Sequence, residues 1–320
     1  MEKEYIFEDD RPFKSCHASS LVHLSNDDIM VTWFAGTKEG DPDVDIWASR
    51  RKGDKWEEPS KICSEEGLPH WNPVLFKGDN GILYLYYKVG HIIPKWYTKV
   101  IESKDDGITW SSPKELVESD IGGRGPVRNK PIILQNGTWV APASIEPESS
   151  LDKKEWDAFV DISKDQGKTW VKSDLIYIDH DLLEGDGLIQ PALWESEPGH
   201  VHMLMRSSEG AIYRSDSDDS GETWNNAYPI DLPNNNSGID VTKLENGVLM
   251  LIYNPVSKNW GPRTPLVISY SHDNGMTWVD SVALETEEGE YSYPAIISKG
   301  NVAYVSYTWK RERIVYWKFS

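Results

Sequence analysis

Hydrophobic residues occur along this chain in short runs rather than on the faces of helices. Segments such as 82–87 (ILYLYY), 248–253 (VLMLIY) and 302–307 (VAYVSY) either alternate with polar residues or are continuously apolar. Runs of this length are typical of β-strands, and no segment keeps the 3.6-residue period of an amphipathic helix. The pattern therefore predicts an all-β protein.

One octapeptide, Ser-x-Asp-x-Gly-x-Thr-Trp, recurs between these strands. Its copies begin at Ser103, Ser163, Ser217 and Ser271, which are 60, 54 and 54 residues apart. In a hairpin turn the Asp accepts hydrogen bonds from nearby backbone N–H groups, the Gly adopts a positive φ, and the Trp covers the apolar layer between sheets. A period of about 50 residues is typical of a propeller blade. We interpret the carboxylates of these turns as structural rather than catalytic: Asp105, Asp165, Asp219 and Asp273.

A second repeated feature is a short segment that leads into an apolar run. Its copies are 16–19 (CHAS), 71–74 (WNPV), 128–131 (RNKP), 189–192 (IQPA), 238–241 (GIDV) and 291–295 (YSYPA). These six copies predict six blades in one domain that covers residues 1–320, and a degenerate octapeptide at 49–56 (SRRKGDKW) fits the first blade. The last blade is short of sequence, so the stretch Glu4-Tyr5-Ile6-Phe7 is expected to supply its outer strand and close the ring.

The octapeptide matches the Asp-box, or BNR repeat, so the chain resembles the sialidase superfamily of β-propellers. In a propeller the first strand of each blade lines the axis, and the polar residues of the six segments are therefore expected to meet at one mouth. An alternative is that these side chains only fill and hydrate the central tunnel. The residues in question are His17, Asn72, Lys130, Gln190, Asp240 and Tyr291.

The resemblance implies a Tyr nucleophile, an Asp acid/base on a first-blade loop, and arginines that hold a substrate carboxylate. Tyr291, in the segment EYS, resembles the Tyr-Ser nucleophile segment of sialidases, which are an exception to the use of two carboxylates. Arg206 and Arg263 resemble the second and third arginines, at similar offsets before an Asp-box. Asp41 or Asp43 lies on the loop where the family has its acid/base.

Two positions depart from the family pattern. His17 is most nearly at the place of the first arginine, and Gln190 stands where the family has the Glu that activates the Tyr. Glutamine cannot take a proton, so the usual Tyr/Glu pair is broken. Candidates to restore the missing charge are Lys14, Arg124, Arg128 and Lys130, and candidates to replace the base are Glu184 and Asp186.

The first expectation for function is an exo-acting glycoside hydrolase that cleaves a terminal acidic sugar from an oligosaccharide. The second is a lyase or rhamnosidase-like enzyme on a rhamnose–glucuronate linkage, with His17 as base or acid, because related propellers act on such sugars with a histidine near the axis. The third is a sugar-binding propeller that has lost catalysis. Fold alone does not choose among them.

Composition narrows the range of partners. The net charge of −19 disfavours nucleic acid and anionic membranes, although a local cluster of arginines outweighs distant, screened carboxylates. Fifteen Trp and fifteen Tyr suit a sugar-binding surface. We find no motif for a metal or other cofactor, no apolar run long enough to span a membrane and no leader, so we expect a cytoplasmic protein in which Cys16 and Cys63 stay reduced. Nothing indicates the oligomeric state.

Overall fold

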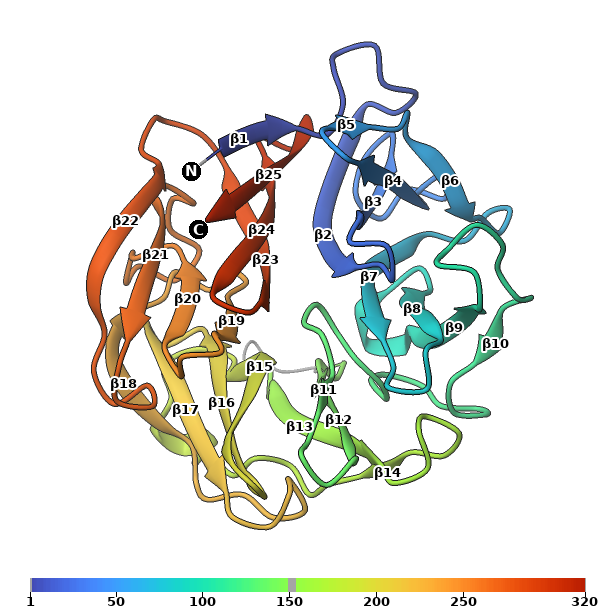
Figure 1. The fold of residues 1–320 in the computed structure, drawn as a ribbon. Helices are drawn as coiled ribbons and strands as arrows, with labels where there is room; N and C mark the ends of the chain where they lie inside the picture. The colour runs from blue at the N-terminus through green and yellow to red at the C-terminus, as the bar shows by residue number, and fades with distance from the viewer. Residues whose placement is uncertain (1, 149–153, 320) are drawn as a thin grey trace.

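Sheets of antiparallel strands are arranged in a ring around a central axis (Figure 1). The structure is a computed structural model that describes residues 2–148 and 154–319. Within these residues there are six sheets, each forming one blade of a β-propeller, so the predicted all-β, six-bladed fold is confirmed. The first strand of a blade lies at the axis and the last at the rim (Figure 1).

The blades follow one another in chain order, and their strands run from the axis to the rim. Blade 1 contains β2 (Ser15–His23), β3 (Ile29–Gly36), β4 (Asp45–Lys52), β5 (Lys55–Trp56) and β6 (Ser60–Cys63). Blade 2 contains β7 (His70–Lys77), β8 (Leu83–Val89), β9 (Tyr97–Ser103) and β10 (Lys114–Glu115). Blade 3 contains β11 (Ile132–Ile133), β12 (Trp139–Ile145), β13 (Asp157–Ser163) and β14 (Val171–Lys172). Blade 4 contains β15 (Leu188–Glu197), β16 (His200–Ser207), β17 (Ala211–Ser217) and β18 (Tyr228–Pro233). Blade 5 contains β19 (Asp240–Lys243), β20 (Leu249–Tyr253), β21 (Leu266–Ser271) and β22 (Val279–Glu285). Blade 6 contains β23 (Tyr291–Lys299), β24 (Val302–Trp309), β25 (Arg313–Phe319) and β1 (Glu2–Tyr5). Short 3-10 helices, η1 (Ile93–Lys95) and η2 (His180–Leu182), lie in two of the connections.

The N-terminal strand closes the ring. As expected, it is the outer strand of the last blade: β1 pairs with β25, although it spans Glu2–Tyr5 and begins two residues before the predicted stretch. The carboxylate of Glu4 also accepts hydrogen bonds from Arg51 Nε at 2.9 Å and from Trp56 Nε1 at 2.7 Å, both in blade 1. The N-terminal strand, paired with the C-terminal strand in blade 6 and hydrogen-bonded through Glu4 to blade 1, thus holds the first and last blades together.

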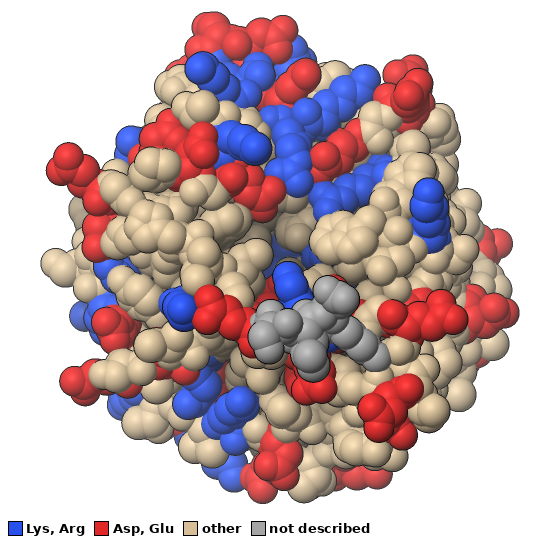
Figure 2. Space-filling model, turned by 180° about the vertical axis from the view of Figure 1, so that it is seen from behind, with Lys and Arg blue, Asp and Glu red and all other residues tan. Residues whose placement is uncertain are grey.

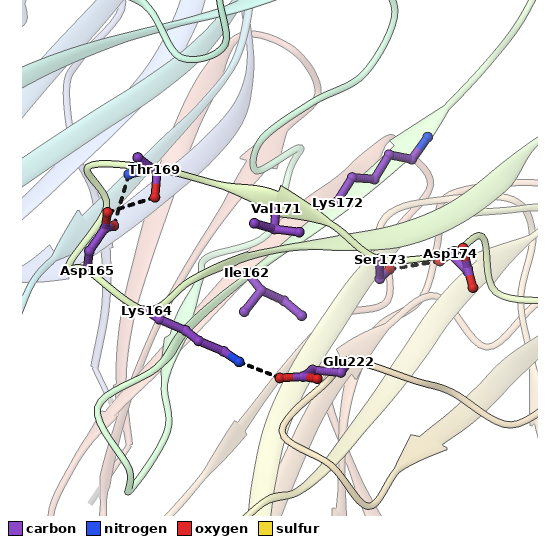
Figure 3. Close-up of a pocket in the computed structure, with 9 residues that line it drawn as sticks. All are labelled: Ile162, Lys164, Asp165, Thr169, Val171, Lys172, Ser173, Asp174 and Glu222. Carbon is purple, nitrogen blue, oxygen red and sulfur yellow. Dashed lines mark hydrogen bonds and ion pairs between the residues drawn. The ribbon is translucent and has the colours of Figure 1, made fainter.

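The octapeptide turns have the hydrogen bonds that their sequence predicts. In blade 3 the carboxylate of Asp165 accepts from the backbone N–H of Thr169 at 2.9 Å and from its hydroxyl at 2.7 Å (Figure 3). The hydroxyl oxygen of Ser163 accepts the backbone N–H of Gly167 at 2.8 Å. Gly167 has a φ of +80°, which other residues adopt only with strain. These carboxylates are occupied within their own turns. The tryptophans of the four octapeptides pack against the buried clusters between sheets: Trp110, Trp170, Trp224 and Trp278.

A cleft of about 500 Å³ lies beside the blade 3 turn, where Lys164 pairs with Glu222 of the next blade at 2.5 Å (Figure 3). Its lining includes the turn residues Asp165 and Thr169. The Asp165 and Thr169 side chains already bond to each other, as do those of Lys164 and Glu222, so the search for a site turns to the axis.

Candidate active site

The inner segment of every blade has a backbone irregularity near the axis. β2, β7, β15 and β23 each contain a shift of register in their pairing with the next strand, as a β-bulge produces. A bulge interrupts the alternation of side chains and redirects one of them. A residue other than glycine has a positive φ in each of these four strands and in the segments that precede β11 and β19: Ala18, Asn72, Gln190, Tyr293, Arg128 and Asn236.

Tyr293 is the residue on which the inner segments converge. Its ring centroid lies 4.2 Å from that of His17, in the neighbouring blade 1. The guanidinium carbon of Arg128 lies 5.3 Å from the ring centroid and that of Arg206 lies 5.8 Å away. Arg128 precedes blade 3 and Arg206 belongs to blade 4, and neither blade is next to blade 6 in the ring. These contacts are therefore made across the axis.

Arg206 is buried on β16 and hydrogen-bonded to three other inner segments. Its Nη1 donates to the hydroxyl oxygen of Tyr293 at 2.8 Å and to Oε1 of Gln190 at 3.2 Å. Its Nε donates to Oδ1 of Asn236 at 2.7 Å. The guanidinium group is thus held in one orientation, and its Nη2 has no recorded partner among the described residues.

A pair of arginines, Arg263 and Arg311, is joined by the carboxylate of Glu290. Arg263 Nη1 donates to Glu290 at 2.7 Å and its guanidinium carbon lies 5.3 Å from the Tyr293 ring centroid. Arg311, in the β24–β25 turn, donates from Nε to the same carboxylate at 2.9 Å and from Nη1 to Glu39. Burial alone would raise the pKa of Glu290, but the two arginines outweigh it and hold the pKa below its ordinary value. Glu290 is therefore ionised and anchors both cations.

Figure 2 shows a face of the molecule on which Lys and Arg side chains gather around a central hollow. Arg263 and Arg311 keep 16% and 29% of their side chains exposed, so they are accessible from solvent, whereas Arg206 is buried. Together with Tyr293, these residues define what we call the arginine cluster: Arg128, Arg206, Arg263, Arg311 and Tyr293.

Arg128 is the most deeply enclosed arginine of the cluster. Its Nη1 donates to the backbone oxygen of Ser19 at 3.1 Å and its Nη2 donates to the backbone oxygen of Pro294, so it links blades 1 and 6. Burial lowers its pKa to about 10, which leaves it charged at neutral pH. The sequence placed Arg128 among the candidates to restore positive charge, and the structure brings it to the cluster.

His17 lies within the arginine cluster, packed against Tyr293 and Phe34. It is 1% exposed, and burial together with the charges of Arg311, Arg263, Arg128 and Arg206 holds its pKa well below its ordinary value. His17 is therefore neutral at physiological pH. It supplies hydrogen-bonding atoms rather than the charge of the arginine that the resemblance expects here.

Tyr291 is not brought to the cluster, which corrects the expectation for this residue. Its side chain is 1% exposed and lies in the apolar cluster between blades 5 and 6, with its ring centroid 6.4 Å from that of Trp309. The register shift between Ser292 and Ala295, with Tyr293 at a φ of +52°, directs Tyr293 and not Tyr291 to the axis. Regular alternation would have placed both side chains on the same face.

The two candidate acids on the first-blade loop have different surroundings. Asp43 accepts from Thr37 N at 3.0 Å and from its hydroxyl at 2.8 Å, and it lines a cleft on blade 1 with Lys14. Burial would raise the pKa of Asp43, but these hydrogen bonds outweigh it and leave the pKa lowered. The carboxylate of Asp43 therefore stabilises the conformation of its own loop through Thr37. Asp41 is half-buried, and its neighbours in the loop contact two other blades: Glu39 pairs with Arg311 of blade 6 and Gly40 lies against Trp71 of blade 2.

Lys130 and Asp240, expected at the mouth, pair with each other. Lys130 Nζ lies 2.9 and 3.0 Å from the two carboxylate oxygens of Asp240, which also accepts the backbone N–H of Ile296 at 2.8 Å. The pair ties blades 3, 5 and 6 together, so it fits the alternative that such residues fill the tunnel. Asn72 is buried at the matching place in blade 2.

Among the described residues, the interactions found for the other candidates for charge or base are with groups other than Tyr293. Lys14 lines the blade 1 cleft and Arg124 donates to Asp161 at 2.7 Å. The Asp186 carboxylate accepts the backbone N–H of Lys154 at 3.0 Å, and the backbone N–H of Glu184 donates to Glu209 at 2.9 Å.

Three further residues at the arginine cluster were missed by the sequence analysis. The ring centroids of Trp156 and Trp260 lie 6.0 and 5.6 Å from the guanidinium carbon of Arg206. Trp260 is 60% exposed. Burial raises the pKa of Glu146, on the connection after β12, against the opposing charge of Arg206. A tryptophan beside a cationic site is a signal for sugar binding, but 15 tryptophans in the chain made these two indistinguishable from the rest.

Two properties bear on cofactors and membranes. The described residues contain no group of three or more His, Cys, Asp or Glu side chains arranged to hold a metal ion. Among the same residues no helix has the length and apolar character needed to cross a bilayer.

Comparisons with known proteins agree with the six-bladed fold. The model of a family described as "BNR repeat-like domain" matches residues 27–305. No curated protein matches the chain in sequence. The Hadza microbial sialidase Hz136 is 18% identical and has a TM-score of 0.81 over 99% of this chain and 68% of its own. A protein of unknown function from Dyadobacter fermentans is 17% identical, with a TM-score of 0.78 over 99% and 97% of the two chains.

A third solved structure, the NanB sialidase from Streptococcus pneumoniae, is 14% identical, with a TM-score of 0.76 over 99% of this chain and 70% of its own. At such identities the likeness shows the fold. The family model, in contrast, covers most of the sequence. The chain therefore belongs to the BNR repeat-like domain family, within the sialidase-like BNR superfamily of six-bladed β-propellers.

Proposed function

We propose that the chain is an exo-acting glycoside hydrolase that removes a terminal acidic sugar from a glycan. The observation that carries this proposal is the arginine cluster: the guanidinium groups of Arg206 and Arg263 lie against one phenol, that of Tyr293, and the accessible Arg311 shares the carboxylate of Glu290 with Arg263. Guanidinium groups bind carboxylates with two parallel hydrogen bonds, so this cluster suits a sugar that carries a carboxylate.

In this proposal Tyr293 faces the anomeric carbon of the bound sugar. Its oxygen either attacks that carbon, with its proton passing to solvent water, or stabilises the positive charge that develops there as the glycosidic bond breaks. Asp41 gives a proton to the leaving oxygen, and the water that then attacks the anomeric carbon supplies the hydroxyl of the released sugar and returns a proton to Asp41. Asp43 is not assigned this role because its oxygens are bound to Thr37.

The exposed ring of Trp260 and the buried ring of Trp156 flank Arg206 on one side. Aromatic rings cover the apolar faces of sugars, so this side suits the rest of the glycan chain. A free end of the glycan enters the hollow and the chain continues past Trp260, as exo-cleavage requires.

One observation favours a second candidate, a lyase on a uronate-containing glycan. His17 is neutral and lies against Tyr293, and neither of its ring nitrogens has a partner within residues 2–148 and 154–319, so one nitrogen is free to take a proton next to a uronate carboxylate. A lyase breaks the bond without adding water and leaves a conjugated double bond in the product.

The test is incubation of the full chain with a panel of sialylated and uronate-containing oligosaccharides, read by mass spectrometry. Products heavier by one water support hydrolysis. Products without added water, with ultraviolet absorbance, support the lyase. Binding without any product supports the third candidate, a sugar-binding propeller, since Gln190 beside Arg206 cannot act as a base.

A further inference from the structure

His17 has hydrogen-bonding atoms that the protein does not use. Nδ1 and Nε2 are both buried, and neither has a partner among the described residues. Buried polar atoms in folded proteins almost always have a partner, because an unpaired one keeps the full cost of leaving water. His202 shows the usual arrangement: its Nε2 bonds Ser196 at 2.7 Å and its Nδ1 bonds Asp216 at 2.5 Å. The cost at His17 therefore calls for an explanation from its location.

That location is the centre of the arginine cluster. The ring of His17 packs on Tyr293 and, at a centroid distance of 5.6 Å, on Phe34. The charged groups that face it come from other elements: Arg206 from β16, Arg263 from the β20–β21 connection, Arg311 from the β24–β25 turn and Arg128 from the segment before β11. With these cations and burial disfavouring a proton, the imidazole has one N–H donor and one acceptor nitrogen.

The family resemblance implies a positive charge at this place, and among the arginines Arg311 acts most strongly on His17. Arg311 reaches the mouth from the last blade and is fixed by Glu290 and Glu39. With that cation present, the position of His17 is free for a neutral group. A sugar hydroxyl both donates and accepts, as a neutral imidazole does, so the two are suited to each other.

We propose that His17 is a specificity-determining residue that recognises hydroxyl groups of the acidic sugar through its two ring nitrogens, while Arg206, Arg263 and Arg311 hold the carboxylate. This inference rests on the proposed function for its substrate class, an acidic monosaccharide unit, but not on turnover.

Two opposite effects of one substitution follow. In His17→Phe a ring of similar shape still packs on Phe34 and Tyr293 and no polar atom is left unpaired, so the free protein is as stable as the wild type or more stable. The same change removes the hydrogen bonds to the sugar, so the dissociation constant rises about tenfold. His202→Phe is the matched control, because it breaks bonds that the protein does make, and it lowers the melting temperature.

The experiment uses the full chain without any assay of turnover. Melting temperatures are measured for the wild type, His17→Phe, His17→Asn and His202→Phe, and calorimetry gives the affinity of each for sialic acid and glucuronic acid. We expect His17→Phe to melt at or above the wild-type temperature and to bind the better of the two acids about tenfold more weakly. His17→Asn keeps a neutral donor and acceptor and binds more tightly than His17→Phe.

A His17→Phe protein that melts as low as His202→Phe, or that binds the sugar as tightly as the wild type, overturns the inference, as does a wild type that binds neither acid. Affinity that increases on acidification between pH 8 and pH 5 in the wild type and not in His17→Phe shows a charged His17 and also overturns it. Binding with the expected His17 effects but without cleavage of any glycan refutes the proposed hydrolase and leaves this inference in place.

Discussion

Single residues in strained backbone conformations make the site. Tyr293 has a φ of +52° and Gln190 a φ of +55°, a region that costs a bulky residue on the order of 1–3 kcal/mol. Both residues hydrogen-bond to Arg206, Tyr293 through its hydroxyl and Gln190 through its amide oxygen, and these bonds offset part of the strain. Such outliers concentrate at functional sites, and here they point the side chains at one another across the axis.

Replacing Arg206 with lysine tests the cluster at the residue scale. The guanidinium group makes bonds to Tyr293, Gln190 and Asn236 at fixed angles, and a single ammonium group cannot reproduce them. We expect Arg206→Lys to raise KM for an acidic glycoside roughly tenfold or more, measured by steady-state kinetics. Arg124→Lys is the control, since Arg124 is also hydrogen-bonded but pairs with Asp161 away from the cluster. Equal effects of the two substitutions would contradict the role of Arg206.

The element that repeats along the chain is the octapeptide turn, and its contribution to stability depends on pH. Hydrogen bonds from the hydroxyl and backbone of Thr169 lower the pKa of Asp165 to about 2 from 3.8, and Asp105 and Asp273 show the same shift for the same reason. A carboxylate whose pKa is lower in the folded state stabilises the fold above its unfolded pKa. This stability is present above about pH 4 and is lost as the pH falls through about 2.

A protein with Asp105, Asp165 and Asp273 all changed to Asn should be less stable than the wild type at pH 7 and lose less of its remaining stability between pH 4 and pH 2. Asn keeps one acceptor oxygen but carries no charge to be neutralised by acid. Urea unfolding followed by circular dichroism at a series of pH values measures the difference. Parallel stability curves for the two proteins would show that these turns do not set the acid sensitivity.

The whole molecule is held as a ring by interactions that cross the axis and by the closing strand. Lys130 and Asp240 join blades 3 and 5, and Asp240 also receives the N–H of Ile296 in blade 6. β1 belongs to blade 6 and its Glu4 bonds blade 1. Because these links join parts of the chain far apart in sequence, the site at the mouth depends on the ring staying closed.

Asp240→Asn tests the axial pair. Asp240 is buried and Lys130 keeps 20% of its side chain exposed, so the change leaves a largely enclosed ammonium group without its anion. We expect a loss of about 2–3 kcal/mol in the free energy of unfolding, somewhat less than for a fully buried pair. Adding Lys130→Met to Asp240→Asn should recover part of this loss. Purely additive effects in urea unfolding would show that the two side chains do not stabilise each other.

The sequence was sufficient to predict the architecture but not the detail of the site. Four octapeptides and six inner segments set the blades, because turn chemistry and strand periodicity are local properties. Strand alternation could not predict which of Tyr291 and Tyr293 faces the axis, because residues two positions apart lie on the same face of a regular strand. The register shift between Ser292 and Ala295 places only Tyr293 there. Arg311 escaped notice because the last blade folds back to the mouth and no motif marks its turn.

The assignment of the phenol can be tested by a matched pair of substitutions, Tyr293→Phe and Tyr291→Phe, in the full chain. The measurement is the rate of release of the acidic sugar from a glycoside that the wild type cleaves. The account predicts that Tyr293→Phe lowers kcat on the order of a hundredfold or more while Tyr291→Phe, whose ring lies in the core, turns over at close to the wild-type rate. An active Tyr293→Phe enzyme beside an inactive, folded Tyr291→Phe enzyme would contradict it.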